Sequence, residues 1–128
     1  MIFDTDFLIA YARGTKRLPK KAARAYIASL PASEPLLISR VTWMEFVAGY
    51  EDEATAASDL PTVTVLPFDG ALWWAASRIL RDLGLRGLTI GTPDCMIAAT
   101  ALAYGQTLAT LNVGHFRRID GLSLAEVT

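Results

Sequence analysis

The first ten residues, MIFDTDFLIA, constrain the fold most, because a short apolar run there ends in a carboxylate. Ile2 and Phe3 predict a buried parallel strand, and Asp4 then lies at its carboxyl end, where open α/β sheets bind their ligands. A competing interpretation is that Asp4 or Asp6 only caps the helix that begins near Phe7. The choice depends on whether other acids reach the same edge of the sheet.

The rest of the chain alternates strands with helices and contains no repeats or linkers. Further strands are expected at residues 36–38, 63–66 and 108–111, with a last short one near 122–124. Helices are expected at residues 5–12, 20–30, 40–49, 51–60, 70–83 and 93–104. This order predicts one domain over residues 1–128, a three-layer α/β/α fold around a central, mainly parallel sheet of four to five strands.

Several helix ends carry recognisable signals. Ser39 and Asp69 are expected to cap the helices that follow them, and Gly84 is expected to end the helix that starts near residue 70. Thr92 is expected to cap a buried helix with Asp94 in its first turn. The apolar stripe of the helix at 70–83 is predicted to comprise Leu72, Trp73, Ala76, Ile79, Leu80 and Leu83.

Composition excludes several classes of function. No apolar run approaches the roughly 18 residues of a membrane span, and acids replace the basic region of a secretory signal, so we expect a cytoplasmic protein. Cys95 and His115 are the only cysteine and histidine. They cannot provide a disulfide or the nitrogen and sulfur ligands of a structural zinc site. Any metal must therefore be bound mainly by oxygen.

Four oxygen-bearing side chains are predicted to meet at one edge of the sheet. Asp4 ends the first strand, Glu45 lies in the helix after the second, Asp94 opens a buried helix and Asn112 follows the fourth strand. Three carboxylates at close quarters require a cation, and Mg²⁺ or Mn²⁺ prefers such ligands. The set predicts metal-assisted hydrolysis of a phosphodiester. The alternative for Glu45 is a capping box with Thr42.

Three neighbours are candidates to orient these groups or their waters. Thr5 and Asp6 follow the first carboxylate, and Thr110 precedes Asn112 by two residues. For the threonines, the alternative is an ordinary hydrogen bond at a strand end.

Four segments resemble the PIN domain family, particularly its VapC-type toxin ribonucleases: DTDFLI, the helix with Glu45 before Gly49, TPDCMIAATA, and TLNVGHFRRIDGL. The resemblance implies that Asp4, Glu45 and Asp94 bind metal and that Asn112 replaces a fourth acid, often Asp. An amide brings no charge, so one or two ions remain open. Asp6 stands where the family usually has Ser, Thr or Asn, and its charge can partly replace the missing one.

The resemblance also implies RNA cleavage, homodimers, and inhibition by a small antitoxin whose tail wraps the toxin. A basic block without acids, which includes Lys16, Arg17, Lys20 and Lys21, is a candidate for contacts with RNA phosphates, although a solvated helix face is the alternative. The helices also carry more aromatic surface than a small core needs, and some of it is expected to form an interface. These aromatic residues are Tyr26, Trp43, Phe46, Trp73 and Trp74.

Other families fit less well. In haloacid-dehalogenase-like phosphatases the first Asp of DTD is a nucleophile, but those enzymes need Thr or Val where this chain has Leu8, and a later Lys. All three lysines lie early, which also argues against a receiver domain. A catalytically silent PIN-like module that binds RNA or protein is the remaining alternative. Its weakness is that it has no reason to keep three mutually repelling acids.

Overall fold

The computed structural model describes residues 1–128 and contains a single five-stranded sheet, in which every pair of neighbouring strands is parallel. The strands are β1 (Ile2–Phe3), β2 (Leu37–Ser39), β3 (Thr64–Leu66), β4 (Leu108–Thr110) and β5 (Leu124–Glu126), in the order β3-β2-β1-β4-β5. The helices are α1 (Thr5–Arg13), α2 (Lys20–Ser29), α3 (Arg40–Val47), α4 (Glu53–Ser58), α5 (Ala71–Leu85), α6 (Thr92–Ala103) and α7 (Val113–Phe116). The predicted three-layer α/β/α class is confirmed.

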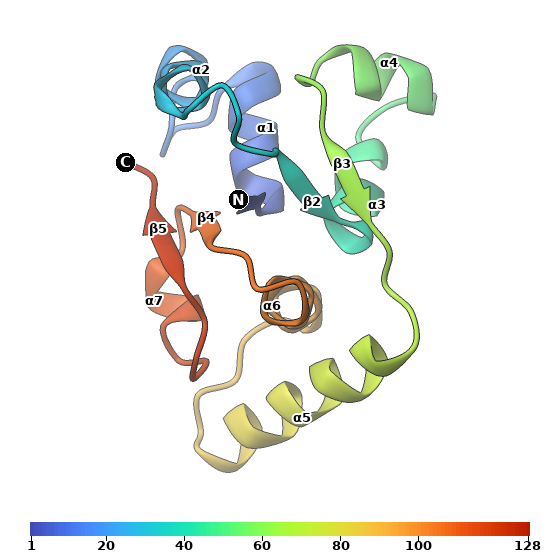
Figure 1. Cartoon of the computed structure of the whole chain (residues 1–128), viewed down its shortest axis with the longest axis vertical. Coiled ribbons are helices and arrows are strands. Elements are labelled where there is room, and N and C mark those ends of the chain that lie inside the picture. Colours follow the sequence, from blue (N-terminus) through green and yellow to red (C-terminus); the bar gives the residue numbers. More distant parts are fainter.

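Alternation along the short strands divides the core into two layers. Ile2 and Leu108 point to the face covered by α5 and α6, whereas Phe3 and Ala109 point to the face covered by α1 and α2 (Figure 1). Each layer holds a cluster of 12 buried apolar residues. The central strands are therefore apolar on both faces, as a sheet between two helical layers requires.

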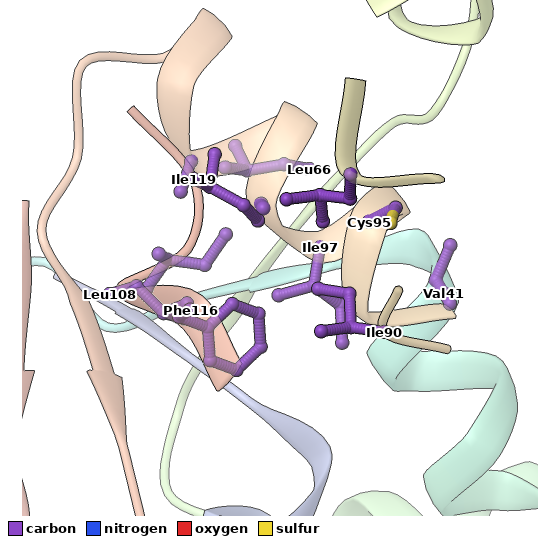
Figure 2. Packing of buried hydrophobic residues seen from close by; sticks show 12 residues of the cluster. Val41, Leu66, Ile90, Cys95, Ile97, Leu108, Phe116 and Ile119 are labelled. Atoms are coloured by element: carbon purple, nitrogen blue, oxygen red, sulfur yellow. The ribbon is translucent and has the colours of Figure 1, made fainter. Parts of the chain in front are cut away.

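Helix α6 is the buried centre of one layer. Six of its twelve residues are buried, among them Cys95 and Ile97. Figure 2 shows these two side chains among Ile90, Val41 and Phe116, which come from other parts of the chain. The predicted burial of this helix is confirmed, and it fixes the position of the acid in the first turn. None of the seven helices combines the length and apolarity needed to cross a membrane.

Helix α5 differs from its prediction on one face. Leu72, Ala76 and Leu83 are buried as expected, but Trp73 is 62% exposed and packs edge-on against Phe68 at a ring distance of 4.8 Å. Successive helical residues point about 100° apart, and in this first turn of the helix Leu72 faces the core while Trp73 points outward. The assignment of Trp73 to the apolar stripe was therefore wrong.

The end of α5 also lies beyond the expected Gly84. The helix continues through it to Leu85, Arg86 is the C-cap, and Gly87 follows with a φ of 67°. Leu88 N donates to the Leu83 carbonyl at 2.8 Å, and Gly87 N donates to the Gly84 carbonyl at 3.2 Å. These two bonds form a Schellman motif, whose left-handed position favours glycine. Either glycine could end the helix by local preference, and tertiary packing of the following loop selects the second.

Exchanging these two glycines for alanine is expected to have opposite effects. Gly84 is helical and a Cβ there meets nothing within 4 Å, so Gly84→Ala should stabilise the protein by about 0.5–1 kcal/mol. Gly87→Ala should destabilise it by about 1 kcal/mol or more, because alanine resists a positive φ. Urea unfolding of both variants measures the difference. Equal effects of the two changes would contradict the observed helix end.

The remaining boundaries agree with prediction to within about two residues, with two caps misassigned. Ser39 caps α3 as expected and accepts from Thr42 N at 3.0 Å. Asp69 does not cap α5 with its side chain, because Gly70 is the N-cap. Gly91, not Thr92, is the N-cap of α6. The last strand was expected near residues 122–124 and lies two residues later.

Candidate active site

The predicted acids line one cavity of about 530 Å³ at the carboxyl edge of the sheet. Its lining consists of Asp4, Thr5, Asp6, Ile9, Glu45, Asp94, Asn112 and His115. Only Ile9 among them is hydrophobic. The structure thus brings together the four predicted catalytic side chains with two of their three predicted neighbours, and Thr110 reaches the cavity through a hydrogen bond described below.

Asp4 is both a helix cap and a wall of the cavity. Its side chain is almost fully buried, with 3% exposure. Oδ1 accepts from Phe7 N at 3.0 Å, and Oδ2 accepts from the Thr110 hydroxyl. Burial raises the pKa of Asp4 to about 6, against these two hydrogen bonds, and the charges of Asp6 and Asp94 also raise it. The two interpretations of Asp4 from sequence are therefore compatible.

Glu45 reaches the cavity from α3. Its Oε1 accepts from the Thr5 hydroxyl at 2.6 Å. The capping box with Thr42 is wrong, because Thr42 lies inside the helix and donates its N–H to Ser39. A residue from the first helix therefore orients the carboxylate, and the hydrogen bond joins α1 to α3 at the cavity.

Asp94 lies in the first turn of α6 and is half-buried. Burial raises its pKa, and the negative charges of Glu45 and Asp6 add to that rise, whereas His115 lowers it. The His115 Nδ1 lies 3.7 Å from the Asp94 Oδ2. Asp94 therefore lies close enough to two other acids to feel their charge, as the predicted constellation requires.

Asn112 is held at three points. Its backbone N–H donates to Thr110 Oγ1 at 2.8 Å, and its side-chain Nδ2 donates to Asp6 Oδ2 at 2.8 Å. Its Oδ1 accepts from Arg17, which also donates to the carbonyl of Leu111. Thr110 thus accepts from one site residue and donates to another, Asp4, so the predicted neighbour links β4 to β1.

The four predicted basic residues separate into two groups. Arg17 extends from the loop between α1 and α2 to the rim of the cavity. Lys16, Lys20 and Lys21 are exposed and do not line the cavity. The structure therefore brings only Arg17 to the acids, while the lysines lie at the same end of α2.

The sequence prediction missed His115. This side chain is exposed, lines the cavity and lies on the single turn of α7. Its signal is the three-residue spacing from Asn112, which places both groups on one side of a helical turn. That spacing becomes informative only once the turn after β4 is known to be helical.

The donor chemistry of the cavity fits a divalent cation. Asp4, Asp6, Glu45 and Asp94 supply carboxylates, and hard cations prefer such oxygen ligands. No three of the His, Cys, Asp and Glu side chains lie close enough together to hold an ion as they stand. Each carboxylate instead has its own protein neighbour, as described above. The cavity therefore gathers suitable ligands without closing a coordination shell.

Comparison with known proteins identifies a family. Residues 1–122 match the family described as PIN domain. Ribonuclease VapC1 of Rickettsia felis is 32% identical over 141 aligned residues that cover 100% of this chain and 96% of that protein. The tRNA(fMet)-specific endonuclease VapC of Shigella flexneri is 31% identical over 94 residues, 68% of this chain and 71% of its own length.

A solved structure agrees with these relatives. The 2.2 Å structure of VapBC-1 from nontypeable Haemophilus influenzae superposes with a TM-score of 0.76 and 26% identity, covering 98% of each chain. The fold seen here is thus the fold of a solved relative, in agreement with the family match over residues 1–122. The resemblance seen in the sequence is confirmed: the chain belongs to the PIN domain family, and VapC ribonucleases are among its relatives.

Proposed function

We propose that this protein is a metal-dependent endoribonuclease that hydrolyses RNA phosphodiester bonds and is the toxin of a toxin–antitoxin pair. One observation supports it most: Asp4, Glu45 and Asp94 come from three elements distant in sequence and face one polar cavity. Burial and neighbouring acids raise the pKa of Asp4 and of Asp94, which costs the fold stability, so the presence of these acids favours a function that uses their charge. Relatives of similar length are named ribonucleases.

Asp4, Glu45 and Asp94 are the proposed ligands of Mg²⁺ or Mn²⁺. When bound, the ion lowers the pKa of a water and stabilises the charge that develops on the phosphate. Thr110 and Thr5 orient two of these carboxylates through the hydrogen bonds already described. Residues 1–128 act as one domain in this proposal, and the cytoplasm, where the RNA substrate is found, is the place of action.

The lysines beside α2 are proposed to contact RNA phosphates. Lys20 and Lys21 occupy the first turn of α2, which has no acid and no side-chain cap. Cations at a helix N-terminus oppose the helix dipole, so these lysines do not serve helix stability. Backbone phosphates would be attracted by both the lysines and the exposed N–H groups. Arg17 connects this surface to the cavity.

Replacing Lys16, Lys20 and Lys21 together by alanine is expected to weaken RNA binding and its salt dependence. For every phosphate that is no longer neutralised, the slope of log affinity against log salt should fall by about 0.7 on a single strand. Fluorescence anisotropy with single-stranded RNA at several salt concentrations measures the slope. Arg78→Ala with Arg81→Ala on α5, which covers the other face of the sheet, is the control and removes two positive charges instead of three. An unchanged slope in the lysine variant would leave these residues as a solvated face.

Two protein partners belong to the proposal. The relative from Haemophilus influenzae is a VapBC complex, and we expect a corresponding antitoxin here. A second copy of the chain is expected to cover Trp73 and Trp74, which are 62% and 65% exposed. Phe46, by contrast, is buried in the core and cannot form an interface. Sedimentation of a Trp73→Ser, Trp74→Ser variant should give monomers, with Met44→Ser on α3 as the control.

The decisive test is cleavage by the purified protein. Single-stranded RNA and tRNA should be cut in Mn²⁺ or Mg²⁺, and EDTA should stop the reaction. Sequencing the 5′ ends of the fragments identifies the cleaved site. Absence of both cleavage and thermal stabilisation at millimolar Mn²⁺ would instead support a silent binding module.

A further inference from the structure

The amide of Asn112 has a fixed orientation that bears on its role. Its Oδ1 accepts from the guanidinium of Arg17, and its Nδ2 donates to Asp6 Oδ2 at 2.8 Å. An amide has one oxygen and one NH₂ group, so the contact with a cationic donor on one side defines which end faces the carboxylate. Arg17 also donates to the carbonyl of Leu111, which fixes the guanidinium itself.

This orientation turns Asn112 away from metal binding. A divalent cation at its Oδ1 would have to share that oxygen with the positive charge of Arg17, and the two cations repel. The only other polar end of the side chain is an N–H donor, which no metal binds. Asn112 therefore does not supply the fourth oxygen ligand at the position that the sequence motif suggested.

Asp6 lies on the other side of the same amide. It is exposed in the first turn of α1 and lines the cavity. One of its oxygens accepts from Asn112. Asp4 and Asp94 line the same cavity, so the Asp6 carboxylate shares it with both of these acids.

We propose that Asp6 supplies the fourth carboxylate of the metal site, and that Asn112 and Arg17 are positioning residues that hold it toward the cavity. This inference rests on the proposed metal-dependent function. The amide of Asn112 suits an acid at position 6, because it accepts from Arg17 and donates to Asp6. An acid at position 112 would pair with Arg17 and repel Asp6.

The test measures Mn²⁺ affinity by titration calorimetry, which needs no RNA and no turnover. Asp6→Asn should weaken Mn²⁺ binding by about tenfold or more, the size of effect typical when a group beside a metal is removed. Asp6→Ser, a smaller side chain, should do the same. Asp120→Asn removes an equal charge beside a different cavity and should leave the affinity unchanged. Thermal unfolding without metal checks that each variant is folded.

Two combinations test the positioning roles. Moving the acid, in Asp6→Asn with Asn112→Asp, should not restore the affinity that Asp6→Asn removes, because the new carboxylate pairs with Arg17. Asn112→Ala should weaken Mn²⁺ binding in the parent but should have no further effect in Asp6→Asn, because it acts through Asp6. Equal effects of Asn112→Ala in both backgrounds would overturn the positioning role.

Mn²⁺ binding by Asp4→Asn distinguishes a failure of this inference from a failure of the proposed function. Asp4→Asn should greatly weaken Mn²⁺ binding if the cavity is a metal site at all. Should Asp4→Asn lose the ion while Asp6→Asn keeps the parent affinity, the fourth carboxylate is wrong and the enzyme proposal stands. If Asp4→Asn itself binds Mn²⁺ like the parent, both proposals are overturned.

Discussion

Asp4→Asn, Glu45→Gln and Asp94→Asn are each expected to abolish metal-dependent cleavage of single-stranded RNA, with rates reduced by more than about 100-fold. Each change removes a carboxylate that lines the cavity while keeping the shape of the side chain. A neutral amide binds Mg²⁺ or Mn²⁺ far less well than a carboxylate and does not offset its charge. Initial rates on a labelled RNA measure the effect.

Folding should survive all three changes. In Asp4→Asn the side-chain oxygen can still accept from Phe7 N, so the cap of α1 is kept. Circular dichroism and thermal unfolding check this point, and Asp120→Asn serves as a charge-matched control for activity. Undiminished cleavage in any one of the three variants would remove that residue from the site.

Neutralising Asp94 is expected to stabilise the metal-free protein at pH 7 by about 1 kcal/mol, or roughly 3–5 °C in Tm. Two carboxylates about 6 Å apart repel by roughly 3 kcal/mol at an effective dielectric near 20, and protonation and counterions reduce this figure. Two effects favour the charged form of Asp94 instead. A negative charge at a helix N-terminus contributes about 0.3–1 kcal/mol, and His115 Nδ1 lies 3.7 Å from the carboxylate. We expect repulsion and burial to outweigh both.

The stability gained by Asp94→Asn is expected to increase as pH rises. Burial and the charges of Glu45 and Asp6 raise the pKa of Asp94 in the folded state. The folded protein therefore holds this proton to a higher pH than the unfolded chain, and the cost of the ionised group appears as pH rises past the unfolded pKa. The advantage of Asp94→Asn should be present at pH 7 and absent at pH 4. Urea unfolding in EDTA at both values measures it.

Saturating Mn²⁺ should reverse the order of the melting temperatures of the parent and Asp94→Asn. A ligand at about 100 times its Kd stabilises the folded state by about 2.7 kcal/mol, and Asp94→Asn binds it more weakly. The parent should then melt at the higher temperature. If Asp94→Asn is less stable than the parent at pH 7 in EDTA, Asp94 is mainly a helix-terminal charge and the crowded acidic cavity is wrong.

Local patterns in the sequence predicted the strands, the helices and the meeting of the acids. Asp4 and Asn112 could be placed because parallel strands deliver their carboxyl ends to one edge of a sheet. The choice between Gly84 and Gly87 could not be predicted, because both suit a helix end and packing decides between them. Glu45 was ambiguous for a similar reason, since its partner Thr5 lies 40 residues away.

The hydrogen bond between Arg17 and Asn112 was beyond prediction altogether. The two residues are 95 positions apart, and neither composition nor periodicity relates a loop arginine to an amide after β4. This bond divides the four predicted basic residues. Arg17 contacts the site, whereas Lys16, Lys20 and Lys21 lie outside the cavity. Long-range hydrogen bonds of this kind depend on the finished fold.

Strand β1 lies between β2 and β4, and Asp4, which follows it, accepts a hydrogen bond from Thr110, 106 residues later in the chain. During synthesis the first strand leaves the ribosome long before the strand that completes its second edge. A growing chain therefore has no finished cavity until the segment around Asn112 has emerged. The cavity is therefore completed only as translation of the protein nears its end.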